Sequence, residues 1–262
     1  MKIRLYNHHY LTDDGSWVYI FMDQMKQLED FGLYDEMEVL SYTALGNQEQ
    51  IKLFKDLCAL YPKIEIHEIH NDVTGEELKD FSSAKGQEQK KFVFEIPTIK
   101  RMWLDAQTQD FYGLYFHGKG VTAFNNAFKV GDVAKFKNYY YWRKYLEYGF
   151  IERWKTCVEA LERYETAGIN LNHDPFLHYS GNFWWLRSDY MRTLDDIEDS
   201  QWWKENKQPY HLDRMIAEFW PLSKANKIFN IDSPPLRLCS PNPGLYSETY
   251  MRKYYDRELT RN

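Results

Sequence analysis

A histidine and a lysine separated by glycines follow an apolar segment near the middle of the chain. The segment 111–116 reads FYGLYF, which is typical of a buried β-strand, and His117-Gly118-Lys119-Gly120 follows it directly. Glycines at the end of a buried strand permit close approach of a ligand to the backbone. The lysine can pair with a phosphate, and the histidine can donate a hydrogen bond to one or act as a lone metal ligand. The alternative is a positively charged loop that binds nothing.

The segment HYSGNFWW, residues 178–185, is a second candidate for binding. Within Ser180-Gly181-Asn182, the glycine permits close approach and the asparagine can hydrogen-bond to hydroxyl groups of a sugar. Adjacent tryptophans on a strand point to opposite faces, so one of Trp184 and Trp185 is expected in the core while the other offers a stacking surface. The alternative is that both lie in the core.

The elements that must position these residues alternate between strands and helices. Apolar alternation predicts strands at 2–11, 36–45 and 63–72, followed by the strand at 111–116. Helical spacing predicts helices at 17–32, 47–62 and 95–107, with Asn47 as an N-cap and Pro97 in a first turn. This order is typical of a parallel sheet with crossover helices, which binds ligands at the carboxyl ends of its strands. The residues expected at those ends are Asn7, His8, His9, Tyr42, Thr43, Asn71, Asp72 and 117–119.

The second half of the chain is less regular. We predict a long aromatic helical stretch over 136–168 that breaks near Gly149, a strand from Tyr179 to Leu186 that runs into a helix, another helix over 209–224, and a proline-rich surface loop over 233–250. The sequence contains no repeat and no clear linker, which favours one compact domain.

The composition narrows the class of protein. The chain has 262 residues and a formal net charge of −6, which argues against a general nucleic-acid binder. It has neither an apolar run as long as the roughly 18 residues of a transmembrane helix nor the apolar core of a secretion signal. Three widely spaced cysteines suit a reducing cytosol, so we expect a cytoplasmic protein. Aromatic residues make up 18% of the chain, a weak pointer to sugar or base stacking.

Several familiar signatures of chemistry are missing from the sequence. It contains no dinucleotide-binding or P-loop glycine motif, no nucleophile elbow and no HExxH zinc motif. His67 and His70 in HEIH would face opposite sides of a strand, so we interpret them as solvated residues rather than metal ligands.

Four blocks of the sequence, taken together, resemble a known group of proteins. The blocks are EIPTIKRMW, LYFHGKGV, WRKYLEYGFIERWKTCVEALERYETAGIN and HYSGNFWWLRSDYMRTL, which span Glu95 to Leu194. They resemble small glycosyltransferase-like proteins of bacterial surface-polysaccharide gene clusters and large algal viruses. The resemblance implies a GT-A-like (Rossmann-like) α/β fold with a mostly parallel twisted sheet flanked by helices, in which residues 1–122 form a nucleotide-binding half and residues 123–262 an acceptor-side half.

The resemblance also implies roles for the two candidate sites, with one departure. In GT-A enzymes the strand corresponding to 111–116 ends in an Asp-x-Asp tip that holds a divalent ion against the donor diphosphate. This chain has His117-Gly118-Lys119 there, so Lys119 is expected to counter the diphosphate charge instead. One imidazole is too few ligands for Mg²⁺, and the missing carboxylates argue against dependence on Mn²⁺ or Mg²⁺. The turn at Ser180, Gly181 and Asn182 would lie beside the donor and acceptor sugars.

Inverting sugar transfer needs a carboxylate or imidazole to take the proton of the acceptor hydroxyl. The resemblance favours Asp213, an acidic residue at the start of the helix after the SGN strand, although a solvated helix-end carboxylate is an equal alternative. Other options are His173, Asp174, His178, His211 and Glu218. We further expect the nucleotide base and ribose to contact Tyr6, Asn7, His8 and Thr43, with Thr98 and Arg101 reaching toward the tip.

These expectations lead to a nucleotide-sugar-dependent glycosyltransferase that adds a sugar to a glycan or lipid-linked acceptor, in surface-polysaccharide or glycoprotein synthesis. Such a protein would need no nucleic-acid partner, and peripheral association with a membrane is compatible with it. The alternatives are a non-catalytic carbohydrate- or partner-binding module that kept the fold, or another nucleotide-dependent transferase.

Overall fold

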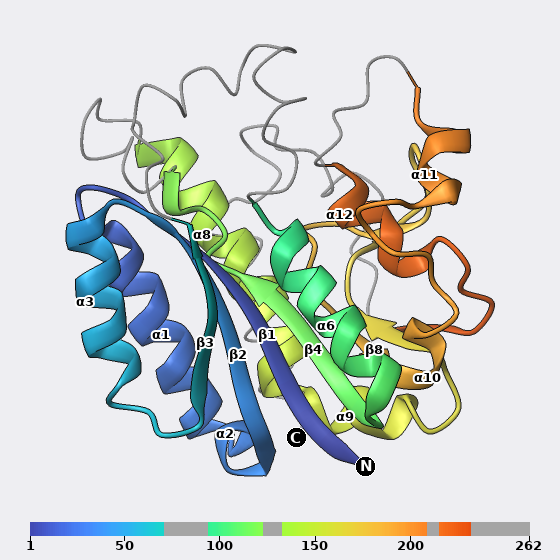
Figure 1. Ribbon diagram of the computed structural model, residues 1–262, viewed down its shortest axis with the longest axis horizontal. Helices are drawn as coiled ribbons and strands as arrows, with labels where there is room; N and C mark the ends of the chain where they lie inside the picture. The colour runs from blue at the N-terminus through green and yellow to red at the C-terminus, as the bar shows by residue number, and fades with distance from the viewer. Residues whose placement is uncertain (71–93, 123–132, 209–214, 232–262) are drawn as a thin grey trace.

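The computed structural model describes residues 1–70, 94–122, 133–208 and 215–231, built around a seven-stranded sheet in the order β3-β2-β1-β4-β8-β5-β9 (Figure 1). Four consecutive strands of that order are mutually parallel: β1 (Lys2–Leu11), β2 (Met37–Gly46), β3 (Ile64–His70) and β4 (Phe111–His117). Strand β8 (Trp184–Arg187) runs antiparallel to β4 and to β5 (Thr166–Gly168), while β9 (Ile228–Asn230) is parallel to β5. The expected α/β class with a mostly parallel sheet is confirmed.

Helices cover both faces of the parallel part of the sheet. Helices α1 (Ser16–Asp30) and α3 (Gln48–Cys58) pack on one face, and α6 (Ile96–Thr108) and α10 (Ser188–Met191) pack on the other (Figure 1). The middle of β1 is buried from Leu5 to His9, as expected for a parallel strand that is covered on both faces. The expected cap is present, since the Asn47 side chain accepts a hydrogen bond of 2.9 Å from the backbone N–H of Gln50.

The remaining described elements are short, apart from one helix. Helix α8 (Val133–Glu147) continues into a π-helix (Tyr148–Glu152) and then α9 (Trp154–Ala160), so the expected break near Gly149 is confirmed. A glycine is needed there because a Cβ at position 149 would lie 2.9 Å from two carbon atoms of Ile169. The other elements are α2 (Leu33–Glu36), β6 (Leu171–Asn172), β7 (His178–Tyr179), α11 (Gln201–Asn206), α12 (Ile216–Phe219) and the 3₁₀ helix Trp220–Leu222.

The order of the strands changes direction beside β1. From β1 the chain moves outward through β2 to β3 and then returns to the other side of β1 as β4. The register places His8 opposite both Thr43 and His117. Because β4 ends at His117 whereas β1 continues to Leu11, the carboxyl edge has a step at this point. Such a switch point is where open α/β sheets bind ligands.

The expected strand from Tyr179 to Leu186 is not continuous, and this prediction is wrong. Strand β7 pairs with β6 in a separate sheet, and β8 joins the main sheet only from Trp184. Between them the backbone turns, with φ of 106° at Gly181 and 57° at Asn182, conformations that interrupt a strand.

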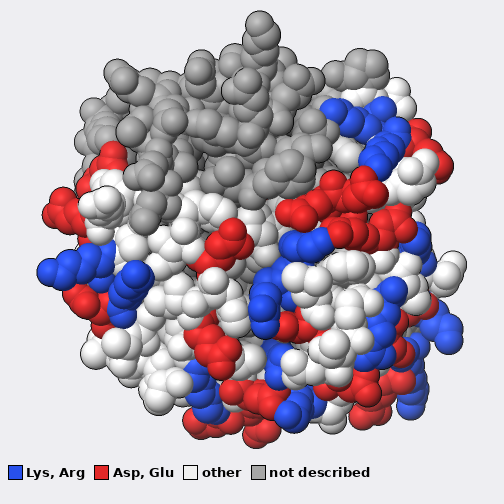
Figure 2. All heavy atoms as spheres, viewed as in Figure 1, with Lys and Arg blue, Asp and Glu red and all other residues white. Residues whose placement is uncertain are grey.

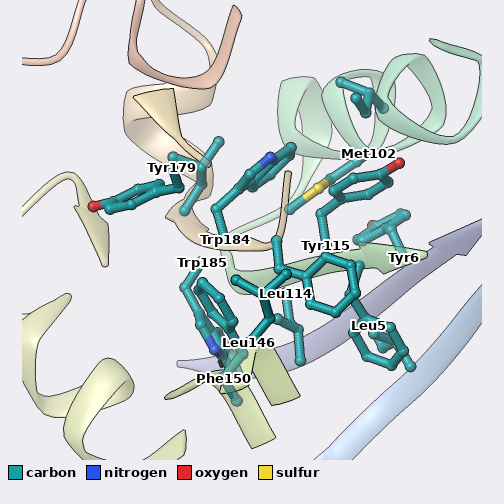
Figure 3. Packing of buried hydrophobic residues seen from close by; sticks show 14 of the residues in the cluster. Leu5, Tyr6, Met102, Leu114, Tyr115, Leu146, Phe150, Tyr179, Trp184 and Trp185 are labelled. Atoms are coloured by element: carbon teal, nitrogen blue, oxygen red, sulfur yellow. Dashed lines mark hydrogen bonds between the residues drawn. The ribbon is translucent and has the colours of Figure 1, made fainter. Parts of the chain in front are cut away.

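Both tryptophans of the SGNFWW segment belong to the core (Figure 3). Trp184 stacks on Tyr115 with ring centroids 4.8 Å apart, on the side of the sheet that α6 covers. Trp185 points to the opposite side, where its Nε1 donates a 3.1 Å hydrogen bond to the carbonyl of Phe150. The expectation that one of the two tryptophans, in particular Trp184, offers a stacking surface to a ligand is therefore wrong, and the alternative that both lie in the core is confirmed. The alternation of faces places each ring under a different covering helix.

Candidate functional site

A cleft of about 640 Å³ opens at the step in the carboxyl edge of the sheet. Strand β1 contributes His8 and Tyr10, and the end of β4 contributes residues 117–120. The turn between β7 and β8 adds Ser180 and Gly181. The structure thus brings the two sequence blocks with candidate chemistry into one cavity. Further lining side chains come from Glu95, Tyr139, Trp142, Asn172, Asp174, His178 and Glu218.

The two glycines of the tip, Gly118 and Gly120, are favoured at their positions for different structural reasons. Gly120 has φ of 87°, a conformation that disfavours any residue with a side chain. Gly118 has its N–H bonded to the carbonyl of His8 at 3.0 Å, and a Cβ there would lie 3.1 Å from Nδ1 of His9. Close packing of the tip against β1 therefore explains Gly118 without a ligand.

Lys119 extends into the cleft over an aromatic ring. Its Nζ lies 3.8 Å from the centroid of the Trp142 indole, within the range of a cation–π interaction. Trp142 belongs to α8, so this contact connects the tip of β4 to the helix across the cleft. The interaction keeps a positive charge within the cavity.

His117 faces a carboxylate that the sequence analysis did not select. Its Nδ1 lies 3.0 Å from Oε1 of Glu95, although the contact lacks the alignment of a hydrogen bond. Nδ2 of Asn182 donates to the other oxygen, Oε2, over 3.2 Å. Burial and the charge of Lys119 hold the pKa of His117 well below its usual range, so the imidazole is neutral.

Glu95 could have been found from the predicted topology. It immediately precedes α6, and a helix that follows a parallel strand begins at the carboxyl edge of the sheet. Within the sequence, however, an acidic residue in front of a helix is typical of a helix-end charge and gives no separate signal of function.

His8 lies at the base of the cleft in a line of buried polar contacts. Its Nδ1 is 3.0 Å from Oγ1 of Thr43, whose hydroxyl contacts that of Thr98 on α6. Burial lowers the pKa of His8 to about 3, so this imidazole is also neutral. Thr43 and Thr98 are buried inside the sheet–helix interface and do not line the cleft. The expected contact of Thr43 with the base and ribose and the expected reach of Thr98 toward the tip are therefore wrong.

Three other candidates lie away from the cleft. Tyr6 is fully buried and its hydroxyl donates a 2.8 Å hydrogen bond to Asp105, to which Arg101 also pairs at 2.8 Å. Asn7 is buried within β1. Because β1 extends to Leu11, positions 6 and 7 lie mid-strand rather than at its end, and their expected role in binding a nucleotide is wrong.

Only some of the candidate general bases lie within the described residues. Asp213 and His211 lie outside the described residues. Of the other options, Asp174, His178 and Glu218 line the cleft. His178 Nδ1 lies 2.7 Å from the carbonyl oxygen of Phe176, and α12 carries Glu218.

A group of charged side chains on α8 is connected through Gln24 to the end of β4. Glu147 is fully buried, and its carboxylate lies 3.2 Å from Nε of Arg143 and 3.3 Å from Nζ of Lys144. The side-chain amide of Gln24, on α1, donates both to Glu147 and to the backbone carbonyl of His117, each over 3.2 Å. Gln24 of α1 thereby couples these ion pairs, all of them within α8, to the position of His117.

On the face seen in Figure 2, the surface charges are of mixed sign. There, Lys and Arg alternate with Asp and Glu over the described elements. The two histidines of β3 pair with exposed neighbours, His67 with Glu65 at 3.4 Å and His70 with Glu68 at 3.0 Å. Within the described ranges, no three His, Cys, Asp or Glu side chains are grouped so as to hold a metal ion. Among the same residues, no helix has the length and apolar character needed to cross a lipid bilayer.

Comparisons with known proteins leave the family open. No protein-family model and no curated protein matches the chain. Among solved structures, the chain is similar to 4-diphosphocytidyl-2C-methyl-D-erythritolsynthase from Anaerococcus prevotii, with 9% sequence identity, 99% of each chain covered and a TM-score of 0.37. A likeness this low carries no argument about fold or function.

Proposed function

We propose that this protein is a glycosyltransferase that moves a sugar from a nucleotide-sugar donor to the hydroxyl group of a glycan or lipid-linked acceptor. The observation that carries the proposal is the position of Lys119, whose ammonium group lies in a polar cleft at the switch point of a parallel sheet. The resemblance to GT-A-like proteins supports the same assignment, because the corresponding tip binds the donor diphosphate in those enzymes.

Lys119 would take the place of the metal ion at the diphosphate. When the bond between the sugar and the phosphate breaks, negative charge accumulates on the leaving phosphate oxygen. An ammonium group that is already in the cleft can stabilise this charge without a carboxylate-bound cation. Ser180 and Gly181 line the same cleft and would contact the sugar.

Binding of nucleotides gives the first test. UDP, GDP, dTDP and CMP, each with and without Mn²⁺, are added to the protein in thermal-shift measurements. At least one nucleotide should raise the melting temperature, because a ligand that binds only the folded state stabilises it. Lys119→Met should remove this shift, whereas Lys26→Met, an exposed lysine paired with Asp30 on α1, should keep it.

Turnover gives the second test. The matching nucleotide sugars are incubated with the protein, and release of the free nucleotide is measured. Binding without turnover over a range of acceptors would favour a non-catalytic module on the same fold. Absence of any stabilising nucleotide would refute the assignment.

A further inference from the structure

Two side chains that line the cleft, His117 and Glu95, form a continuous polar chain with a third, the buried Asn182. The amide of Asn182 donates to one oxygen of Glu95 over 3.2 Å, and the other oxygen of Glu95 lies 3.0 Å from Nδ1 of His117. They come from three separate elements: the turn before β8, the residue before α6 and the end of β4. A carboxylate that is fixed on one side and faces an imidazole on the other orients that imidazole for proton transfer. Such contacts commonly tighten only when the substrate is bound.

The accessibility of the pair suits a substrate. The side chains of His117 and Glu95 are 13% and 24% exposed, and both line the cleft. Nδ1 of His117 is buried on the side of Glu95, which leaves Nε2 as the nitrogen for a substrate. The ring is also held edge-on by Phe183, with centroids 5.0 Å apart.

In the cleft without a ligand, the imidazole of His117 is a weak base. Burial and the charge of Lys119 lower the pKa of the imidazole, and the neighbouring His8 and His9 of β1 lower it further. Glu95 is the acidic group in contact with it, and from α1 the neutral amide of Gln24 meets its backbone carbonyl. Of the groups that lower the proton affinity, Lys119 is the one whose charge an anionic ligand can neutralise.

We propose that His117 is the general base of this site, that Glu95 positions it, and that an anion bound at Lys119 makes it basic enough to act. The role of the base rests on the proposed glycosyl transfer, whereas the coupling between the anion and His117 does not. In this arrangement, the protein keeps its base weak until a phosphate group occupies the cleft. A hydroxyl group is therefore activated only beside a bound donor.

The step is balanced in atoms and charge. The acceptor oxygen forms a bond to the anomeric carbon of the donor sugar, and its proton passes to Nε2 of His117. The bond between the anomeric carbon and the phosphate oxygen breaks, and its electron pair stays on the phosphate, facing Lys119. The resulting imidazolium is paired with Glu95 through its Nδ1–H. Later loss of the proton to solvent restores the neutral imidazole.

Titration of His117 tests the coupling independently of turnover. The NMR signal of the imidazole, assigned by its loss in His117→Gln, is followed against pH with and without pyrophosphate. Pyrophosphate should move the titration midpoint to higher pH. In Lys119→Met the midpoint should already be higher and should not respond. An unchanged midpoint in the wild-type protein, whether through lack of binding or lack of coupling, or an equal response in both proteins, would overturn the proposal.

Kinetics with an active donor and acceptor test the catalytic roles. His117→Gln should lower the transfer rate about 100-fold or more, the range usual for loss of a general base. Glu95→Gln should cause a smaller loss together with a lower titration midpoint of His117, and Glu95→Asp should recover part of both. Glu65→Gln, which breaks the exposed pair with His67, should change neither.

Two outcomes separate this inference from the proposed function. If pyrophosphate shifts His117 but no nucleotide sugar is consumed, the coupling stands and glycosyl transfer fails. If sugar is transferred while Glu218→Gln abolishes the rate and Glu95→Gln and His117→Gln do not, the function stands and the base is Glu218 instead.

Discussion

Replacing Glu147 by glutamine should destabilise the whole protein and displace the tip of β4. The carboxylate is fully buried and lies within 3.3 Å of Arg143, Lys144, Gln24 and Gln27, and Arg143 itself is only 2% exposed. Glutamine has nearly the same shape but no charge, so among the described residues Arg143 keeps only Asp23, at 3.3 Å, as a carboxylate partner. Removing one member of a buried ion pair costs about 3–5 kcal/mol of unfolding free energy. This corresponds to a fall in melting temperature on the order of 10 °C.

Urea unfolding followed by tryptophan fluorescence measures this loss. Glu159→Gln, an exposed carboxylate on α9, serves as the control and should stay within about 0.5 kcal/mol of the wild type. The double variant Arg143→Met/Glu147→Met should recover most of the loss, because it leaves no unpaired buried charge. A loss of less than about 1 kcal/mol for Glu147→Gln would show that water or other groups already compensate Arg143, and the argument for a buried network would fail.

Two further predictions concern stability at other positions. Burial lowers the pKa of His9 to about 3, so between about pH 3 and 6.5 the unfolded chain binds more protons and stability falls as the pH falls. His9→Phe should reduce this acid sensitivity. Because both ring nitrogens of His9 are buried without partners, the substitution should also add about 1 kcal/mol to the free energy of unfolding at pH 7. Urea unfolding at pH 7 and pH 4.5 measures both effects, and an unaltered dependence of stability on pH would contradict the prediction. Gly181→Ala should lower the melting temperature more than Gly32→Ala. Both glycines have positive φ, but a Cβ at position 181 would lie 2.5 Å from Leu146, whereas the space around position 32 is open. Equal losses of melting temperature in the two variants would refute the role of packing at position 181.

The parallel half of the fold could be predicted from local patterns. Apolar alternation gave the bounds of β1, and Asn47 marked the start of α3, because these signals act over a few residues and do not depend on the rest of the chain. That His8 and His117 lie toward the same edge of the sheet follows from the same patterns, since parallel strands joined by helical crossovers have their carboxyl ends on one side of the sheet.

The wrong predictions concern residues whose surroundings are set by packing between segments far apart in the sequence. An apolar run such as FWWL predicts burial but cannot tell that helices cover both faces of β8, so Trp184 was expected to be available to a ligand. The turn at Gly181 and Asn182 was hidden in the same way, because a glycine inside an apolar run fits a bulged strand as well as a break. The error at Tyr6 has a different cause, because the correctly predicted bounds of β1 already place Tyr6 in the middle of the strand.

The high proportion of aromatic residues is explained largely by the core and says little about a ligand. Trp17, Trp184, Trp185 and Trp220 are fully buried, so a large part of the aromatic excess builds the core rather than a sugar-binding surface. Trp142 is the tryptophan that lines the cleft, and Lys119 lies against its ring. A phosphate that draws the ammonium away would uncover the indole face, so binding of an anion and stacking of a sugar would use the same two residues in sequence. The feature that favours a sugar ligand is therefore the pairing of Trp142 with Lys119, and the number of aromatic residues in the chain contributes little.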